Sequence, residues 1–213
     1  MYIKKIGHCC LVIKDKGLTI LTDPGSFSTA QDSLTGIDVV LITHEHQDHL
    51  HIDSLKKVLA NNPQAKVISN ASVGKILDKE NIAYKIVGDG QQTTVGEILF
   101  EGMGTKHAIV YKDIGQVENT GYFINKKLFY PGDALYDPKR PVDILALPVA
   151  GPWVKFSEFI EYALAVKPKH AFPVHDAVLS NLGIGLSQRM PNLIFDEKGI
   201  AFHPLNAGDE IEL

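Results

Sequence analysis

Four residues of metal-binding type lie within six positions of one short stretch, namely His44, His46, Asp48 and His49. Imidazole nitrogens and carboxylates are good ligands for zinc and similar divalent cations. Because alternate residues of an extended segment point to the same side, His44 and His46 can face one ion. Asp48 and His49 follow after a turn and can face a second ion. The spacing therefore predicts a metal site that can hold two cations.

This stretch directly follows residues 38–43, a continuous apolar run of strand length. Such a run is typical of a strand that is covered on both faces. A loop at the end of a buried strand is firmly anchored and still open to solvent. These are the conditions that a catalytic metal site with an open position requires.

The elements that must position the site are mainly short apolar segments bounded by turn residues. We expect strands over residues 2–6, 9–14, 18–22, 38–43, 66–69, 83–87, 128–130, 144–147, 170–174, 200–203 and 210–213. We expect helices over residues 52–60, 71–79 and 156–166. Strands and loops without a clear helix are expected between residues 91 and 125. This order indicates two β-rich halves flanked by helices, which composition alone defines only as α/β or α+β.

Length and composition limit the classes of protein that the chain can belong to. Its 213 residues favour a single domain over residues 1–213. Its net charge is −4 and it has no basic stripe, so no nucleic-acid partner is expected. No apolar run is long enough for a signal peptide or a membrane span. A cytoplasmic location is therefore expected, and the two neighbouring cysteines, Cys9 and Cys10, fit a reducing compartment because a disulfide between them would be strained.

Residues 43–49 resemble the metal-binding signature of the metallo-β-lactamase superfamily, and further landmarks follow in the family's order. These landmarks are Gly7-His8, Leu21–Pro24, His107, Tyr130–Asp133 and Pro173–His175. The similarity is greatest to the compact branch of lactonase-like and uncharacterised hydrolases. It implies a four-layer αβ/βα sandwich, in which two mixed β-sheets lie face to face with helices outside.

The resemblance also implies a set of ligands for two divalent cations. The implied ligands of the first ion are His44, His46 and His107. The implied ligands of the second ion are Asp48, His49 and His175. Asp133 would bridge both ions together with a water or hydroxide. Zn²⁺ is the expected metal, with Mn²⁺ and iron ions as alternatives, because His and Asp sites accept all three.

Several of these residues have simpler interpretations. His107 could be an ordinary solvated loop histidine, and Asp133 could cap the turn after Pro131-Gly132. His170 competes with His175, but His175 ends the apolar run 171–174, and ligands should emerge at strand ends. His51 is expected at a helix start, and His203 is expected at the surface.

Three residues outside the ligand set are candidates for supporting roles. Asp23 would lie behind the ligands and orient one histidine, although it could also be a plain turn residue before Pro24. His8 could line the pocket or support a ligand. Trp153 could form part of the pocket wall, with ordinary packing as the alternative.

The chain is therefore expected to be a metal-dependent hydrolase that cleaves a small polar or anionic ester, lactone or phosphodiester. Asp48, Asp133 and His8 are the residues expected to act in catalysis. The alternative is a catalytically silent metal-bound protein that binds or senses a metabolite. The only partner expected is a small-molecule substrate, and the oligomeric state is left open.

Overall fold

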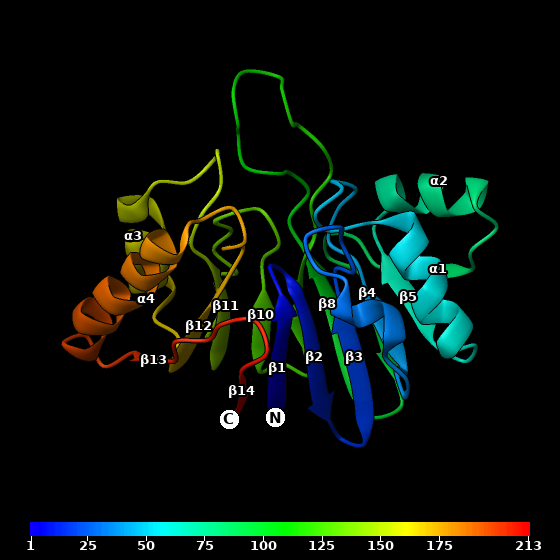
Figure 1. Cartoon of the computed structure of the whole chain (residues 1–213), viewed down its shortest axis with the longest axis horizontal. Helices are drawn as coiled ribbons and strands as arrows, with labels where there is room; N and C mark the ends of the chain where they lie inside the picture. The colour runs from blue at the N-terminus through cyan, green and yellow to red at the C-terminus, as the bar shows by residue number, and fades with distance from the viewer.

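Two seven-stranded β-sheets pack face to face in the computed structural model, which describes residues 1–213 (Figure 1). The first sheet has the order β14 (Glu210–Glu212), β1 (Tyr2–Gly7), β2 (Cys10–Asp15), β3 (Leu18–Thr22), β4 (Val39–Leu41), β5 (Lys66–Ser69) and β6 (Tyr84–Ile86). The second has the order β13 (Ala201–Phe202), β12 (His170–Val174), β11 (Ile144–Pro148), β10 (Leu128–Tyr130), β9 (Gly121–Ile124), β8 (Ile98–Met103) and β7 (Gln92–Val95). Each sheet is mixed, because β3 to β6 and β10 to β13 are parallel whereas the remaining pairs are antiparallel.

Helices cover the outer face of each sheet. The helices α1 (Ile52–Asn61) and α2 (Ala71–Lys79) pack on the first sheet, whereas α3 (Phe156–Val166) and α4 (Asn181–Asp196) lie on the side of the second (Figure 1). A short 3₁₀ helix spans Ala30–Ser33. None of the helices combines the length and the apolar character needed to cross a lipid bilayer. The expected four-layer sandwich is therefore confirmed.

Strand alternation creates the layers. In β4, Val39 and Leu41 face the second sheet and join the core between the sheets, whereas Val40 faces α1 and α2. Every residue of this strand is buried, as expected for a strand covered on both faces. Phe100 and Tyr130 contribute to the central core from the second sheet.

The helix α4 is an element that the sequence did not predict. Gly183, Gly185 and Pro191 lie within it and lower its helix propensity. Its burial is also unusual, because Gln188 is buried whereas Leu182 is 83% exposed. The apolar residues therefore do not mark the buried face, so the usual periodic signal is missing.

The parallel strands of the two sheets present their carboxyl ends to a common region. Asp23 follows β3, residues 43–49 follow β4, Asp133 follows β10, and His175 follows β12. Loops at these strand ends can bring residues that are distant in sequence into one site. The fold therefore brings the candidate metal-binding residues together at one edge of the sandwich.

A buried ion pair ties β1 to the segment that carries His175. Lys5 is 1% exposed, and its Nζ donates to Asp176 Oδ2 at 2.5 Å, Pro173 O at 3.0 Å and Leu205 O at 3.2 Å. All three ammonium protons can therefore find acceptors. Removing the ammonium would leave the buried Asp176 carboxylate without its counter-charge.

We predict that Lys5→Met lowers the free energy of unfolding by about 3–5 kcal/mol, because the substitution keeps much of the apolar stem but isolates a buried carboxylate. Urea denaturation measures the change. The matched control is Lys4→Met on the same strand, whose exposed pair with Glu210 spans 3.8 Å and should contribute less than about 1 kcal/mol. Equal, small losses in both variants would contradict this role for Lys5.

Candidate metal centre

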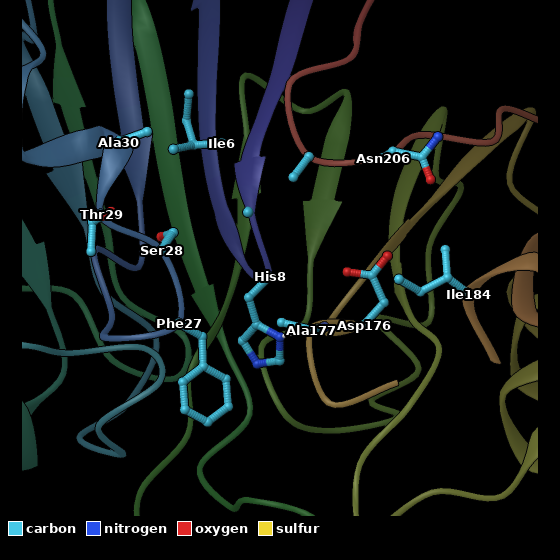
Figure 2. Close-up of a pocket in the computed structure, with 12 residues that line it drawn as sticks. Ile6, His8, Phe27, Ser28, Thr29, Ala30, Asp176, Ala177, Ile184 and Asn206 are labelled. Carbon is cyan, nitrogen blue, oxygen red and sulfur yellow. Dashed lines mark hydrogen bonds between the residues drawn. The ribbon is translucent and has the colours of Figure 1, made fainter. Parts of the chain in front are cut away.

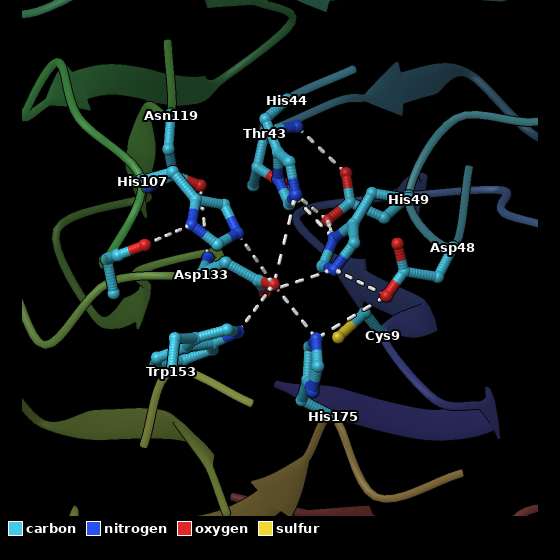
Figure 3. A network of polar contacts seen from close by, with 12 residues as sticks. Cys9, Thr43, His44, Asp48, His49, His107, Asn119, Asp133, Trp153 and His175 are labelled. Atoms are coloured by element: carbon cyan, nitrogen blue, oxygen red, sulfur yellow. Dashed lines mark hydrogen bonds and ion pairs between the residues drawn. The ribbon is translucent and has the colours of Figure 1, made fainter. Parts of the chain in front are cut away.

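The Asp133 carboxylate lies at the centre of a group of buried imidazoles (Figure 3). Its Oδ1 is 3.0 Å from His49 Nε2. Its Oδ2 is 2.9 Å from His175 Nε2 and 3.2 Å from His107 Nε2. Trp153 Nε1 donates a hydrogen bond to the same Oδ2 at 3.1 Å. One carboxylate therefore contacts residues from four separate loops.

The turn before Asp133 explains how its side chain reaches this position. Gly132 has a φ of 63°, a conformation that glycine adopts without steric cost. A Cβ at this position would lie 2.3 Å from Asn119 Oδ1 and 2.9 Å from Thr43 Cβ. Asn119 Oδ1 also accepts from the Asp133 backbone N–H at 3.0 Å. Only glycine fits this close approach, and the Asn119 amide then fixes the position of Asp133.

The seven predicted ligands form two groups that share Asp133. The first group is His44, His46, His107 and Asp133. The second group is Asp48, His49, Asp133 and His175. Within each group the potential ligand atoms all lie within 4.8 Å of one another. Two overlapping groups of this kind suggest a dinuclear site.

The hydrogen bonds around the imidazoles test whether cations fit between them. His49 Nδ1 is 2.7 Å from Asp23 Oδ2, and His107 Nδ1 is 2.5 Å from Ala108 O. Each Nδ1 can donate to its oxygen, which leaves the lone pair of a neutral ring on Nε2. Both Nε2 atoms face the Asp133 carboxylate. Two lone pairs directed at a carboxylate repel it, so each Nε2 must either carry a proton or bind a cation.

Unpartnered buried atoms support the same conclusion. His44 Nε2, His49 Nε2 and both ring nitrogens of His175 are buried without a hydrogen-bond partner. His49 Nε2 lies within ion-pair distance of Asp133, but the two atoms are not aligned for a hydrogen bond. Buried polar atoms normally have partners, and exceptions call for an explanation. The donor set fits divalent cations.

Asp23 holds two of the imidazoles in place. Its carboxylate accepts from Thr43 N at 2.8 Å, from Thr43 Oγ1 at 2.7 Å and from the Tyr130 hydroxyl. It also contacts His49 Nδ1, so it fixes this ring. Thr43 Oγ1 lies 3.0 Å from His44 Nδ1 and can accept a hydrogen bond from it, which links His44 to Asp23 as well. Asp23 therefore lies behind the imidazoles of His49 and His44.

The pKa shifts of the histidines differ between the two groups of potential ligands. Burial, with the neighbouring imidazoles, lowers the pKa of His44 well below its usual value. Burial also opposes the charging of His175, but the Asp133 carboxylate outweighs it and raises the pKa of His175 to about 10. The pKa of His49 is raised in the same way. Without metal, protons on these two rings balance the negative charge of Asp133.

Figure 2 shows His8 beside Phe27 and Ala177, and its ring also contacts the second group through Asp48. Its Nδ1 accepts a hydrogen bond from the Ala177 backbone N–H at 3.2 Å, so its proton must be on Nε2. That nitrogen lies 3.1 Å from Asp48 Oδ2 and can donate to it. His8 also lines a cavity of about 330 Å³ together with Phe27 and Ala177. The sequence left open whether His8 lines the pocket or supports a ligand, and the geometry is compatible with both.

The remaining histidines lie where the simpler interpretations placed them or away from the site. His51 is the residue before α1 and bonds Ser54 Oγ at 3.0 Å. His170 Nδ1 pairs with His203 Nε2 at 3.0 Å, so neither ring belongs to the groups around Asp133. The Trp153 indole is buried and bonds Asp133, so it contacts the site more directly than a pocket wall would.

Sequence reasoning did not single out Thr43, Asn119 or Tyr130, which hold Asp23 and Asp133 in place. Thr43 and Tyr130 belong to the quoted motifs, so their positions were a usable signal. Asn119 lies between two expected strands with no motif around it. Nothing in the local sequence indicates that its amide caps Asp133.

Comparisons with known proteins show what this chain is similar to. Residues 2–175 match the sequence profile described as the beta-lactamase superfamily domain. Protein Rv0786c of Mycobacterium tuberculosis is 34% identical over 185 residues, which cover 84% of this chain and 86% of that protein. The UPF0173 metal-dependent hydrolase NEQ378 of Nanoarchaeum equitans is 26% identical over the full length of both chains. The metallo hydrolase Igni18 of Ignicoccus hospitalis has a similar fold, with a TM-score of 0.79, 16% identity, and coverage of 100% of this chain and 98% of that one.

The stability of the metal-free protein should fall as the pH rises above about 6.5, the usual pKa of histidine in an unfolded chain. Because the pKa of His175 is raised to about 10 in the folded state, its stabilising proton is fully present below the first value and is lost toward the second. A loss of about 2 kcal/mol would lower the thermal midpoint by roughly 4–8 °C. Thermal unfolding of chelated protein across this range measures the effect. A flat profile would contradict the assignment, and metal-loaded protein should not show the decline.

We also predict that Asp23→Asn weakens metal affinity by about 10–100-fold, because an amide orients His49 and His44 less firmly than a carboxylate. Competition with a chromogenic chelator measures the affinity. Asp38→Asn is the matched control, since Asp38 Oδ2 caps the Thr19 N–H at 2.7 Å at the other end of β4. Equal affinities in the two variants would show that Asp23 does not support the site.

Proposed function

Because this chain belongs to the metallo-β-lactamase superfamily, we propose that it is a metal-dependent hydrolase with a dinuclear centre. The observation that carries this proposal is the position of Asp133 between the two groups of potential ligands. Because Asp133 Oδ2 is 3.2 Å from His107 Nε2 of the first group and 2.9 Å from His175 Nε2 of the second, this carboxylate is suited to bridge two cations. Zn²⁺ is the metal that we propose, since five of the seven donors are imidazoles.

A bound pair of divalent cations would supply an acidified water and polarise the carbonyl or phosphoryl oxygen of the substrate. The protein's own residues set the geometry. Trp153 and Asn119 hold Asp133 from two sides, and His8 holds Asp48. Because Asp48 and Asp133 are the only carboxylates in the two groups, the site favours a substrate whose scissile group is anionic or strongly polar. We propose a small ester, lactone or phosphodiester.

The exposed apolar side chains around the site favour a substrate that has an apolar portion next to this polar group. Phe27, 49% exposed, lies with its ring 5.1 Å from that of His8. The segment between β8 and β9, which carries His107, extends away from the sheets (Figure 1) and exposes Ile109 and Tyr111. Gly115 of this segment lies beside His46, since a Cβ there would be 3.9 Å from His46 Cε1. A substrate that enters beside His46 would meet the exposed apolar side chains of this segment, whereas Phe27 lies on the side of His8.

His46→Ala and Asp133→Ala should lose metal and activity together, because each removes a proposed ligand. Elemental analysis and turnover of chromogenic ester, lactone and phosphodiester substrates measure both properties. We expect chelation of the unmodified protein to reduce turnover by at least about 100-fold and added Zn²⁺ or Mn²⁺ to restore it. His203→Ala is the control, because His203 pairs with His170 outside the site.

Variants that keep full metal content and turnover would refute the ligand assignment. A metal-replete protein that hydrolyses none of the three substrate classes, but binds a metabolite tightly, would overturn the enzymatic function and favour a sensor or binding protein.

A further inference from the structure

A third group of potential ligands adjoins the second metal group and contains a cysteine. The ligand atoms of His8, Cys9, His49 and His175 all lie within 4.8 Å of one another. His49 and His175 therefore belong to both groups. Figure 3 shows the Cys9 sulfur between Asp48 and His175. The proposed hydrolytic chemistry does not use this thiol.

The backbone fixes the Cys9 side chain at this position. His8, with a φ of 47°, reverses the chain between β1 and β2, and the pairing register of these strands shifts there. The Cys9 carbonyl then accepts from Thr22 Oγ1 at 2.8 Å and from the Tyr130 hydroxyl at 3.3 Å. Cys9 is 1% exposed, so its sulfur cannot turn to solvent without moving these strands.

The imidazoles beside Cys9 also support a ligand role for its sulfur. The side chain of His175 is 3% exposed and that of His49 is fully buried. Both Nε2 atoms lack a hydrogen-bond partner, and both residues belong to the group that contains the Cys9 sulfur. Two nitrogens and one sulfur therefore converge on one space from three separate elements. A thiolate beside two imidazoles is a donor set that Zn²⁺ and Co²⁺ accept readily.

We propose that Cys9 is a thiolate ligand of the metal ion held by Asp48, His49 and His175. On binding, the S–H bond breaks, the proton leaves to water and a sulfur–metal bond forms, so no oxidant or reductant is needed. A soft donor makes this position prefer Zn²⁺ or Co²⁺ to Mn²⁺. This inference depends on the proposed metal centre but not on the identity of the substrate.

Cys10 provides a matched control one residue away. It is also 1% exposed, but it packs with Leu55 and Val73 in the core between the first sheet and its helices. Cys9 instead belongs to the core between the two sheets. Cys9→Ala and Cys10→Ala each remove one buried sulfur, and only the first removes the proposed ligand.

The experiment is a titration of metal-free protein with Co²⁺ under reducing conditions, followed by absorption spectroscopy. Unmodified protein and Cys10→Ala should both show a near-ultraviolet thiolate-to-cobalt charge-transfer band along with the visible bands of bound Co²⁺. Cys9→Ala should keep the visible bands and lose the charge-transfer band. Its Zn²⁺ affinity at this position should fall at least about 10-fold, the lower end of what loss of a supporting partner costs.

X-ray absorption of the zinc-loaded, unmodified protein gives a result that does not depend on any variant folding. A sulfur scatterer at about 2.3 Å from zinc is expected. Bound metal with no sulfur scatterer and no charge-transfer band would overturn the role of Cys9 and leave the proposed centre intact. Failure of unmodified protein to bind either metal would overturn the centre itself, and with it the proposed function.

Discussion

The site depends on the placement of one buried carboxylate among imidazoles whose outer nitrogens already donate to other acceptors. His49 is committed to Asp23 and His107 to the Ala108 carbonyl through Nδ1, so only their Nε2 atoms remain to face Asp133, and a neutral ring would present a lone pair to it. Such an arrangement is unfavourable in a dry interior unless positive charge lies between the groups. The turn at Gly132, the Asn119 amide and the Trp153 indole all keep Asp133 in this position. The surrounding structure therefore preserves a site that requires cations.

Much of the fold could be predicted from local sequence, because most elements have regularly spaced apolar residues and are bounded by turn residues. The bounds of β3, α2, α3 and β12 were predicted to the residue. The helical spacing of buried apolar residues is missing in α4, where Ser187 and Gln188 are buried whereas Leu182 and Leu193 are exposed. A pattern that equates apolar with buried cannot identify such a helix. The pairing of the two sheets came from the family resemblance, since local propensity does not encode contacts between halves of the chain.

Part of the candidate site could likewise be predicted from sequence, and part of it could not. The spacing of residues 44–49 and the strand-end positions of Asp133 and His175 were visible in sequence, and the structure brings these residues together. The supporting contacts were not visible. Tyr130 and Asp23 are 107 positions apart in the chain, and Trp153 was expected at a pocket wall. Cys9 was expected within a strand, but it lies in the turn before β2. Such contacts depend on tertiary packing, and no short motif specifies them.

The hydrogen bond between Tyr130 and Asp23 has a consequence for how the protein matures. Asp23 comes from the first sheet and Tyr130 from the second, so the carboxylate that aligns His49 and His44 is itself set only after the two halves have docked. A peptide limited to residues 43–49 would carry four donors without this alignment and would hold ions weakly. Tight ion capture should therefore require that the two sheets have docked.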